Sequence, residues 1–219
     1  MKAIDNYRLI LKRVGWVLIV IGILDIGYMI YCIMQRMSYS SSFNVFAVVA
    51  GVFLLKGHLG AVRLITRFVA FMLAGFMGFV LVLLPFIQPP SLWLAQWHLH
   101  PVSTLLGIVF MIAVIALLCW IYRQLRALPV LQARAAAGQS VSPPKGAILT
   151  GILLVVGLAA MMHFTLRGET GAKAIQLAEA KEGPGYKYCV TSMNWGGDHG
   201  RASVTAYNDR EIKSVDVEW

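Results

Sequence analysis

Residues 14–34 read VGWVLIVIGILDIGYMIYCIM, an apolar run that is interrupted by one acidic residue, Asp25. An α-helix rises about 1.5 Å per residue, so a run of this length can cross the roughly 30 Å hydrocarbon core of a bilayer. The run is too long for the apolar region of a signal peptide, and no A-x-A cleavage site follows it. We therefore expect a membrane-spanning helix here.

The composition of the whole chain points to the same environment. Of its 219 residues, 58% are hydrophobic and 13% are charged. A soluble domain has about 25% charged and 45–50% apolar residues. The net charge of +9 does not indicate nucleic-acid binding, because the basic residues before position 167 fall almost wholly between apolar runs. The predicted surroundings are a lipid bilayer, with no nucleic-acid partner.

Four further apolar runs predict an all-α membrane bundle of about five transmembrane helices over residues 1–166. We expect spans near residues 14–34, 43–62, 68–87, 102–122 and 147–166. The second reaches the length of a span only if Lys56 extends its side chain to the interface; otherwise it is a re-entrant or interfacial helix. A loop with Trp93 and Trp97 is expected at the membrane interface, and residues 123–145 form a polar connection.

The distribution of basic residues predicts the orientation. Eleven Lys and Arg residues lie on the N-terminal side of this arrangement, whereas the two short loops opposite contain only Arg36. Basic residues concentrate in cytoplasmic loops, so we expect a cytoplasmic N-terminus in a bacterial inner (plasma) membrane. An odd number of spans then places the C-terminal tail in the periplasm or outside the cell. The eleven residues are Lys2, Arg8, Lys12, Arg13, Lys56, Arg63, Arg67, Arg123, Arg126, Arg134 and Lys145.

The tail, residues 167–219, has a different composition, with seven basic and eight acidic residues. A short helix is expected from Thr170 to Glu182, and Gly183-Pro184-Gly185 ends it. Three alternating runs then predict strands near 186–195, 201–207 and 212–219, separated by segments rich in Gly, Asn and Asp. The tail is therefore predicted to be a small exported α+β domain, in which the helix packs on a three-stranded antiparallel meander.

Asp25 is the sharpest candidate site within the membrane domain. An acid near the middle of a span is unfavourable by a few kcal/mol or more, and it is usually functional or paired. Three interpretations are open. Asp25 is a neutral carboxyl bonded to a neighbouring group, or it carries a proton or cation, or it bonds a polar group of another subunit.

Three histidines form a second candidate. His98 and His100 follow Trp97, and His163 is expected near the same outer surface. Imidazoles in such positions can bind a metal or haem. The alternative is an interfacial loop with amphipathic side chains.

Other features indicate packing. Ala70, Ala74 and Gly78 recur every four residues, as do Ala147 and Gly151, and small residues at this spacing allow helices to approach closely. The three cysteines, Cys32, Cys119 and Cys189, form no CxxC motif, and neither a disulfide framework nor a structural zinc site is predicted. Cys189 is expected to be a small buried apolar residue of a strand.

A membrane helix that is followed by a short helix and a meander with Gly200, Ala202, Val204 and Trp219 resembles the exported domains of respiratory-complex assembly factors. The resemblance covers under a quarter of the chain, and five spans differ from the single span of that family. It implies an assembly role that depends on a protein partner.

The favoured hypothesis is a non-enzymatic membrane subunit or assembly factor that presents its exported domain to another membrane or exported protein, without a cofactor. Motifs for nucleotide hydrolysis, zinc proteolysis, serine hydrolysis and dinucleotide binding are absent from the sequence. One alternative is a small transporter or ion-coupled subunit that uses Asp25. The other is a haem- or metal-binding membrane protein that uses His98, His100 and His163.

Overall fold

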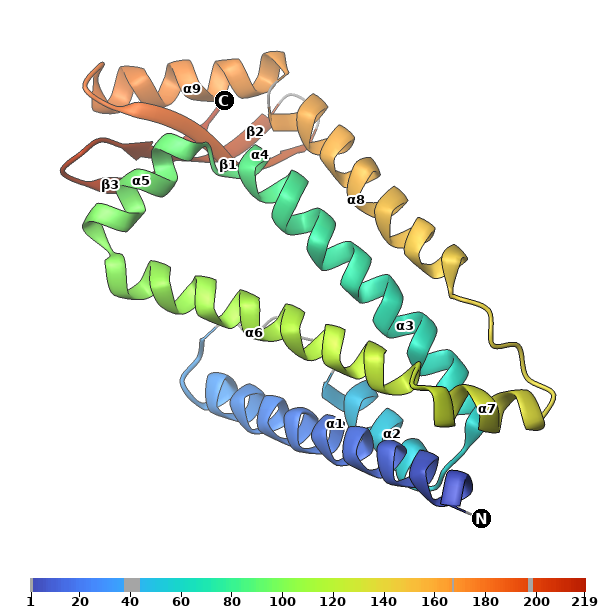
Figure 1. Ribbon diagram of the computed structural model, residues 1–219. Coiled ribbons are helices and arrows are strands. Elements are labelled where there is room, and N and C mark those ends of the chain that lie inside the picture. The colour runs from blue at the N-terminus through green and yellow to red at the C-terminus, as the bar shows by residue number, and fades with distance from the viewer. Residues whose placement is uncertain (1, 38–43, 167, 197–198) are drawn as a thin grey trace. The chain divides into compact units, whose positions relative to one another are not determined.

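The computed structural model describes residues 2–37, 44–166, 168–196 and 199–219 (Figure 1). Within these residues, four helices are long and apolar enough to cross a membrane: Asn6–Met34, Leu59–Leu83, Pro101–Leu125 and Lys145–Leu166. Large apolar side chains remain exposed along them, such as Phe110 at 71% and Phe164 at 78%. Apolar surface of this extent needs a non-aqueous environment. The helices therefore indicate a multi-pass membrane protein.

The first two helices are α1, Lys2–Met34, and α2, Asn44–Leu55. The expected second span, 43–62, is wrong in extent: residue 43 lies outside the described residues, and α2 has 12 residues, about 18 Å of helix. Gly57 ends it in a left-handed conformation (φ +71°), in which the Gly57 amide donates to Leu54 O and the His58 amide to Phe53 O. The expected count of about five spans is therefore not exactly matched, because the described residues contain four helices of spanning length and one shorter apolar helix.

The next helical segment begins at Leu59 rather than near residue 68. It comprises α3, Leu59–Gly78, a π-helical turn η1, Phe79–Leu83, and α4, Leu84–Ile87. Pro85 lacks an amide hydrogen, and the preceding Leu84 amide bonds to Phe79 O, five residues back. The π turn thus ends two residues before the proline.

Two helices occupy segments that were expected to be irregular. α5, Pro90–Leu99, replaces the interfacial loop, and α7, Leu128–Ala136, lies within the polar connection. Each begins with a proline at its first or second position, where no amide hydrogen is needed. The two remaining long helices are α6, Pro101–Leu125, and α8, Lys145–Leu166.

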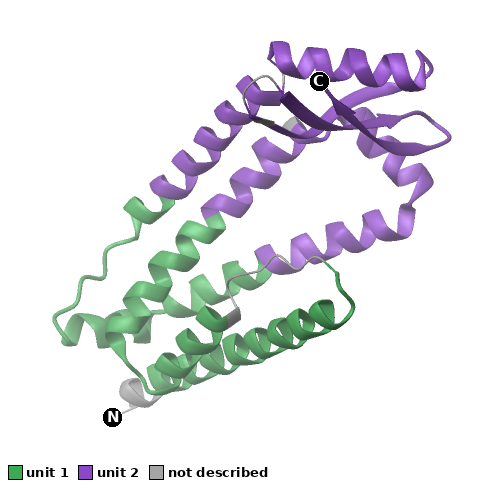
Figure 2. Ribbon diagram, turned by 180° about the vertical axis from the view of Figure 1, so that it is seen from behind, with its two compact units in different colours: residues 1–73, 116–148 green, residues 74–115, 149–219 purple. Residues whose placement is uncertain are grey.

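The chain divides into two compact units, residues 1–73 with 116–148 and residues 74–115 with 149–219 (Figure 2). In the first unit, α1 and α2 touch through glycines: a Cβ atom on Gly51 would lie 2.6 Å from the Gly15 carbonyl oxygen. The core of this unit joins α1, α2, α3, α6 and α7 through buried side chains that include Leu11, Val14, Leu54, Val62, Ile65, Ile121, Leu125 and Val130.

The second unit contains the tail, and the predicted helix and meander are confirmed. The helix is α9, Glu169–Glu182, and the strands are β1, Lys187–Gly196, β2, His199–Tyr207, and β3, Ile212–Glu218. The sheet is antiparallel in the order β1-β2-β3, with a bulge between Val190 and Ser192. The small residues that alternate along β2 are buried together with small residues of α9: Ala202, Val204, Ala206, Ala174 and Ala178.

The opposite face of this sheet is partly covered by α5. Leu92 and Ala95 pack with Tyr207, and the Tyr207 hydroxyl lies 2.7 Å from the Ser91 hydroxyl. Cys189 belongs to the same cluster, and its thiol donates to Ile87 O at 3.4 Å. The sheet therefore has a helix on each face (Figure 1).

Candidate functional site

Asp25 lies within α1 and is half-buried. This position is compatible with a carboxyl that faces other protein groups rather than lipid alone. Its role as a proton or cation carrier, or as a structural hydrogen-bonding group, stays a prediction.

The three histidines all belong to the second unit and are exposed. His98 lies in the last turn of α5, with Nδ1 2.9 Å from Leu94 O, and His100 follows the helix as its C-cap. His163 lies near the end of α8, with its ring edge-on to Phe164. Within the described parts of the chain, no three His, Cys, Asp or Glu side chains form a group that could hold a metal. Haem or metal binding stays a prediction.

Among the small residues of the spans, Gly78 lies where two helices come close. A Cβ atom on Gly78 would lie 3.0 Å from Val155, one turn after Gly151 on α8. Ala70 and Gly151 are buried, whereas Ala74 and Ala147 are half-buried. A packing role for the whole set stays a prediction.

A feature that the sequence did not reveal lies in the first unit, at one end of its helices. We call it the arginine cavity; it has a volume of about 30 Å³. Its lining comes from α3, α7 and the segment before α8. The lining residues are Arg63, Thr66, Arg67, Arg134, Ser140, Ser142, Pro143 and Pro144.

Arg134 is the central residue of this cavity. Its side chain and backbone are almost fully buried, with 3% of the residue exposed. Nη2 donates to Ser140 O at 2.5 Å, whereas Nε is buried without a hydrogen-bond partner within the described residues. Burial lowers the pKa of Arg134, and the positive charges of Arg126, Arg63 and Arg67 lower it further.

Local backbone structure places Ser140 against Arg134. Gly138 adopts φ +68°, and the amides of Gly138 and Gln139 donate to Ala135 O and Arg134 O, which ends α7. The chain then turns back, so that Ser142 O accepts from Arg126 Nη1 at 3.4 Å. Thr66 contributes no free hydroxyl hydrogen, because its hydroxyl donates to Val62 O within α3.

A second candidate surface is the outer edge of β3. Gly200 and Trp219 exchange both backbone hydrogen bonds, at 2.8 and 3.0 Å. Bonded and non-bonded pairs alternate along antiparallel strands, so the β2–β3 register turns the backbone groups of Ser214, Asp216 and Glu218 away from β2. Lys181 of α9 donates to one of these groups, Asp216 O, at 3.2 Å.

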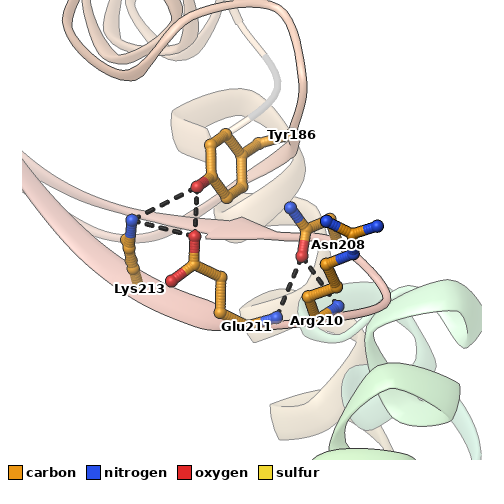
Figure 3. Close-up of polar contacts among 5 residues, drawn as sticks. All are labelled: Tyr186, Asn208, Arg210, Glu211 and Lys213. Atoms are coloured by element: carbon orange, nitrogen blue, oxygen red, sulfur yellow. Dashed lines mark hydrogen bonds and ion pairs between the residues drawn. The ribbon is translucent and has the colours of Figure 1, made fainter.

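A polar cluster lies at the end of the sheet where β1 begins and where the chain turns from β2 to β3 (Figure 3). The Tyr186 hydroxyl donates to Glu211, and Lys213 Nζ lies 2.9 Å from the Glu211 carboxylate. The hydrogen bonds from Tyr186 and Lys213 lower the pKa of Glu211. The bond to Glu211, and a second bond from Lys213 Nζ to the Tyr186 hydroxyl, raise the pKa of Lys213. Asn208 Oδ1 accepts the amides of Arg210 and Glu211, which fixes the turn between β2 and β3.

An open depression of about 620 Å³ lies at the Trp219 end of the sheet. The Trp219 ring fills the space above Gly200, where a Cβ atom would lie 2.3 Å from the ring. Arg201 and Glu218 pair with each other at 3.3 Å and are both exposed. The depression is therefore a surface feature around a fixed tryptophan.

The arginine cavity was missed because its arginines were interpreted only as a signal of orientation. A signal was present in the sequence, since no Asp or Glu occurs between residues 26 and 168 to pair with them. No known family model matches the chain, and comparisons with curated proteins and with solved structures find no significant match.

Proposed function

We propose that this chain is a non-enzymatic, multi-pass membrane accessory protein whose tail binds a partner protein. The observation that carries the proposal is the tail itself. It is a small α+β unit with a core between α9 and the sheet, joined to helices that are long and apolar enough to cross a membrane. Within the described residues, β3 pairs with a strand on one side only.

The outer edge of β3 is the proposed docking surface. Strand β3 pairs with β2 in unbroken register from Ile212 to Glu218, whereas the opposite edge strand, β1, is interrupted by a bulge. Bulges hinder the addition of a further strand. A regular edge with outward backbone groups suits addition of an extended segment from another protein.

The proposed location of the tail is the periplasm or the outside of a bacterial cell. This requires α2 to bring the chain back across the membrane. Supporting contacts lie within the first unit, where a Cβ atom on Gly15 would lie 2.8 Å from Gly51 O and 3.1 Å from the Leu55 side chain. Lys56 therefore follows α2 near the basic start of α1, as a return to the N-terminal side requires.

Replacing Ser214 with proline tests the docking surface. Ser214→Pro removes an amide hydrogen that faces away from β2, so it should leave the β2–β3 pairing intact and prevent pairing with a partner strand. The control is Ser214→Ala, which keeps the amide and loses the same hydroxyl contact with Ser203.

The measurement is co-purification of the full-length chain from its native membrane, followed by mass spectrometry. A partner that is retained by Ser214→Ala and lost by Ser214→Pro supports docking at β3. Equal recovery of every partner with both variants, at equal levels of folded protein, would show that β3 is not the docking surface.

A further inference from the structure

We propose that the arginine cavity binds a single phosphate group. The group can be carried by a phospholipid headgroup or by free phosphate, because both present the same oxyanion. This inference is independent of the proposed partner of the tail, since the cavity lies in the first compact unit and β3 in the second.

Uncompensated positive charge is the first observation. Three arginines line the cavity, and none of the lining residues is acidic. Arg134 is only 3% exposed, so water solvates its guanidinium poorly. A buried charge without a counter-charge is strongly unfavourable. A bound anion would supply the missing counter-charge.

The second observation is a donor that lacks an acceptor. Ser140 O accepts from Nη2 of Arg134, but the buried Nε has no acceptor within the described residues. A guanidinium presents its N–H groups in a planar fork that matches two oxygens of a phosphate. Arg63 and Arg67 line the same cavity, are exposed, and can reach a phosphate from the solvent side.

The size of the cavity limits the ligand. A volume of about 10–15 Å³ admits one water molecule, whereas this cavity measures about 30 Å³. By this measure it holds about two to three oxygen-sized atoms, so it can enclose part of one phosphate group but not a nucleotide base or sugar. The positive charges of Arg126, Arg63 and Arg67 also repel that of Arg134. A bound phosphate would relieve this repulsion.

The position of the cavity makes a lipid headgroup an accessible source. Arg63 and Arg67 lie in the first turns of α3, before the uncharged apolar run that begins at Phe68. The start of an apolar span lies at the level of the phosphates of the lipid headgroups. Free phosphate reaches the same place from the aqueous side.

The test uses the full-length chain in a phosphate-free maltoside detergent. Its thermal unfolding is followed during titration with inorganic phosphate and, separately, with phosphatidylglycerol in mixed micelles. Potassium chloride at matched ionic strength and diacylglycerol, which has the same acyl chains without the phosphate, are the controls. Ligands that bind only the folded state raise the melting temperature once their concentration exceeds the dissociation constant, and the rise continues with the logarithm of the concentration.

We expect a rise in melting temperature that follows this dependence with at least one of the two phosphate probes and with neither control. Such a rise with inorganic phosphate identifies a site open to free phosphate. Such a rise with phosphatidylglycerol alone identifies a headgroup site. In either case Arg134→Gln should weaken the apparent affinity at least about tenfold, because it removes charge-assisted hydrogen bonds.

The matched control is Arg123→Gln, which removes one charge from an exposed arginine of α6 that does not line the cavity. Its affinity should stay within about twofold of the native value. Arg67→Gln changes an exposed lining residue, so it reports on the cavity even if Arg134→Gln does not fold. No stabilisation beyond the controls, or equal losses in the lining variants and Arg123→Gln, would overturn the proposal.

Discussion

Tyr186, Glu211 and Lys213 show how single residues stabilise the tail. Tyr186 precedes β1 and Lys213 lies in β3, and both bond to the carboxylate of Glu211. These two hydrogen bonds, of which the bond from Tyr186 has the larger effect, hold the pKa of Glu211 below its ordinary value. A carboxyl with a lowered pKa stabilises the folded state above the unfolded pKa of about 4.3. That stability is lost as the pH falls through the folded pKa.

Glu211→Gln should therefore make the tail less sensitive to acid. In the native chain, local opening around residues 208–213 should increase as the pH falls below about 4. The Gln variant should open more readily at neutral pH and change little on acidification. Hydrogen–deuterium exchange at residues 208–213, corrected for the intrinsic rate at each pH, measures this opening in the native chain and in the variant. The control is Glu179→Gln, because Glu179 is exposed. Parallel pH profiles for the native and Glu211→Gln chains would contradict this role.

At the scale of helices, the contact between α1 and α2 depends on two glycines. A Cβ atom on Gly51 would meet Gly15 O and the Ile19 side chain, each at 2.6 Å. The backbone oxygen cannot move aside without separating the helices. Gly51→Ala should destabilise the full-length chain by about 1–3 kcal/mol.

The control for Gly51→Ala is Gly27→Ala, on the same helix pair. A Cβ atom on Gly27 has no neighbour within 4 Å among the described residues. Alanine is the better helix former, so this variant should be neutral or slightly stabilising. Thermal unfolding in detergent compares the two. Equal melting temperatures would show that α1 and α2 do not need close contact.

Periodicity explains which elements could be predicted. The alternation of Val215 and Val217 with Asp216 and Glu218 predicted β3, and the structure buries the two valines and exposes the two acids. Gly57 explains one failure, because the helix end that it makes was interpreted as the continuation of a span. The segment of α5 was expected to be an interfacial loop, although a proline such as Pro90 suits the first turn of a helix.

The arginine cavity illustrates a different limit of sequence analysis. Its residues come from α3, α7 and the segment before α8, which are distant in the sequence. Spacing within one element cannot reveal such a site, because it depends on the packing of several helices. The absence of acidic residues between positions 26 and 168 could be counted, but the burial of Arg134 could not.

At the scale of the whole molecule, the number of membrane crossings determines which surfaces face the cytoplasm. Five crossings place the arginine cavity in the cytoplasm and β3 outside. If α2 only lies against α1 and does not cross, the chain crosses the membrane four times. The N-terminus then stays in the cytoplasm, but the arginine cavity lies outside and β3 lies in the cytoplasm. The two arrangements therefore differ at three sites at once: the α2–α3 turn, the end of α7, and the C-terminus.

Reporter fusions at His58, Gly138 and Trp219 should distinguish these arrangements. We expect cytoplasmic signals at His58 and Gly138 and an external signal at Trp219. The expectation rests on the contact of Gly15 with Gly51 and Leu55, which returns the chain to the end of α1 that carries Lys12 and Arg13. Paired reporters, one active only in the cytoplasm and one only outside, give a positive signal at every site. The reverse pattern at all three sites would mean that α2 does not complete a crossing, and it would place both the tail and its proposed partner in the cytoplasm.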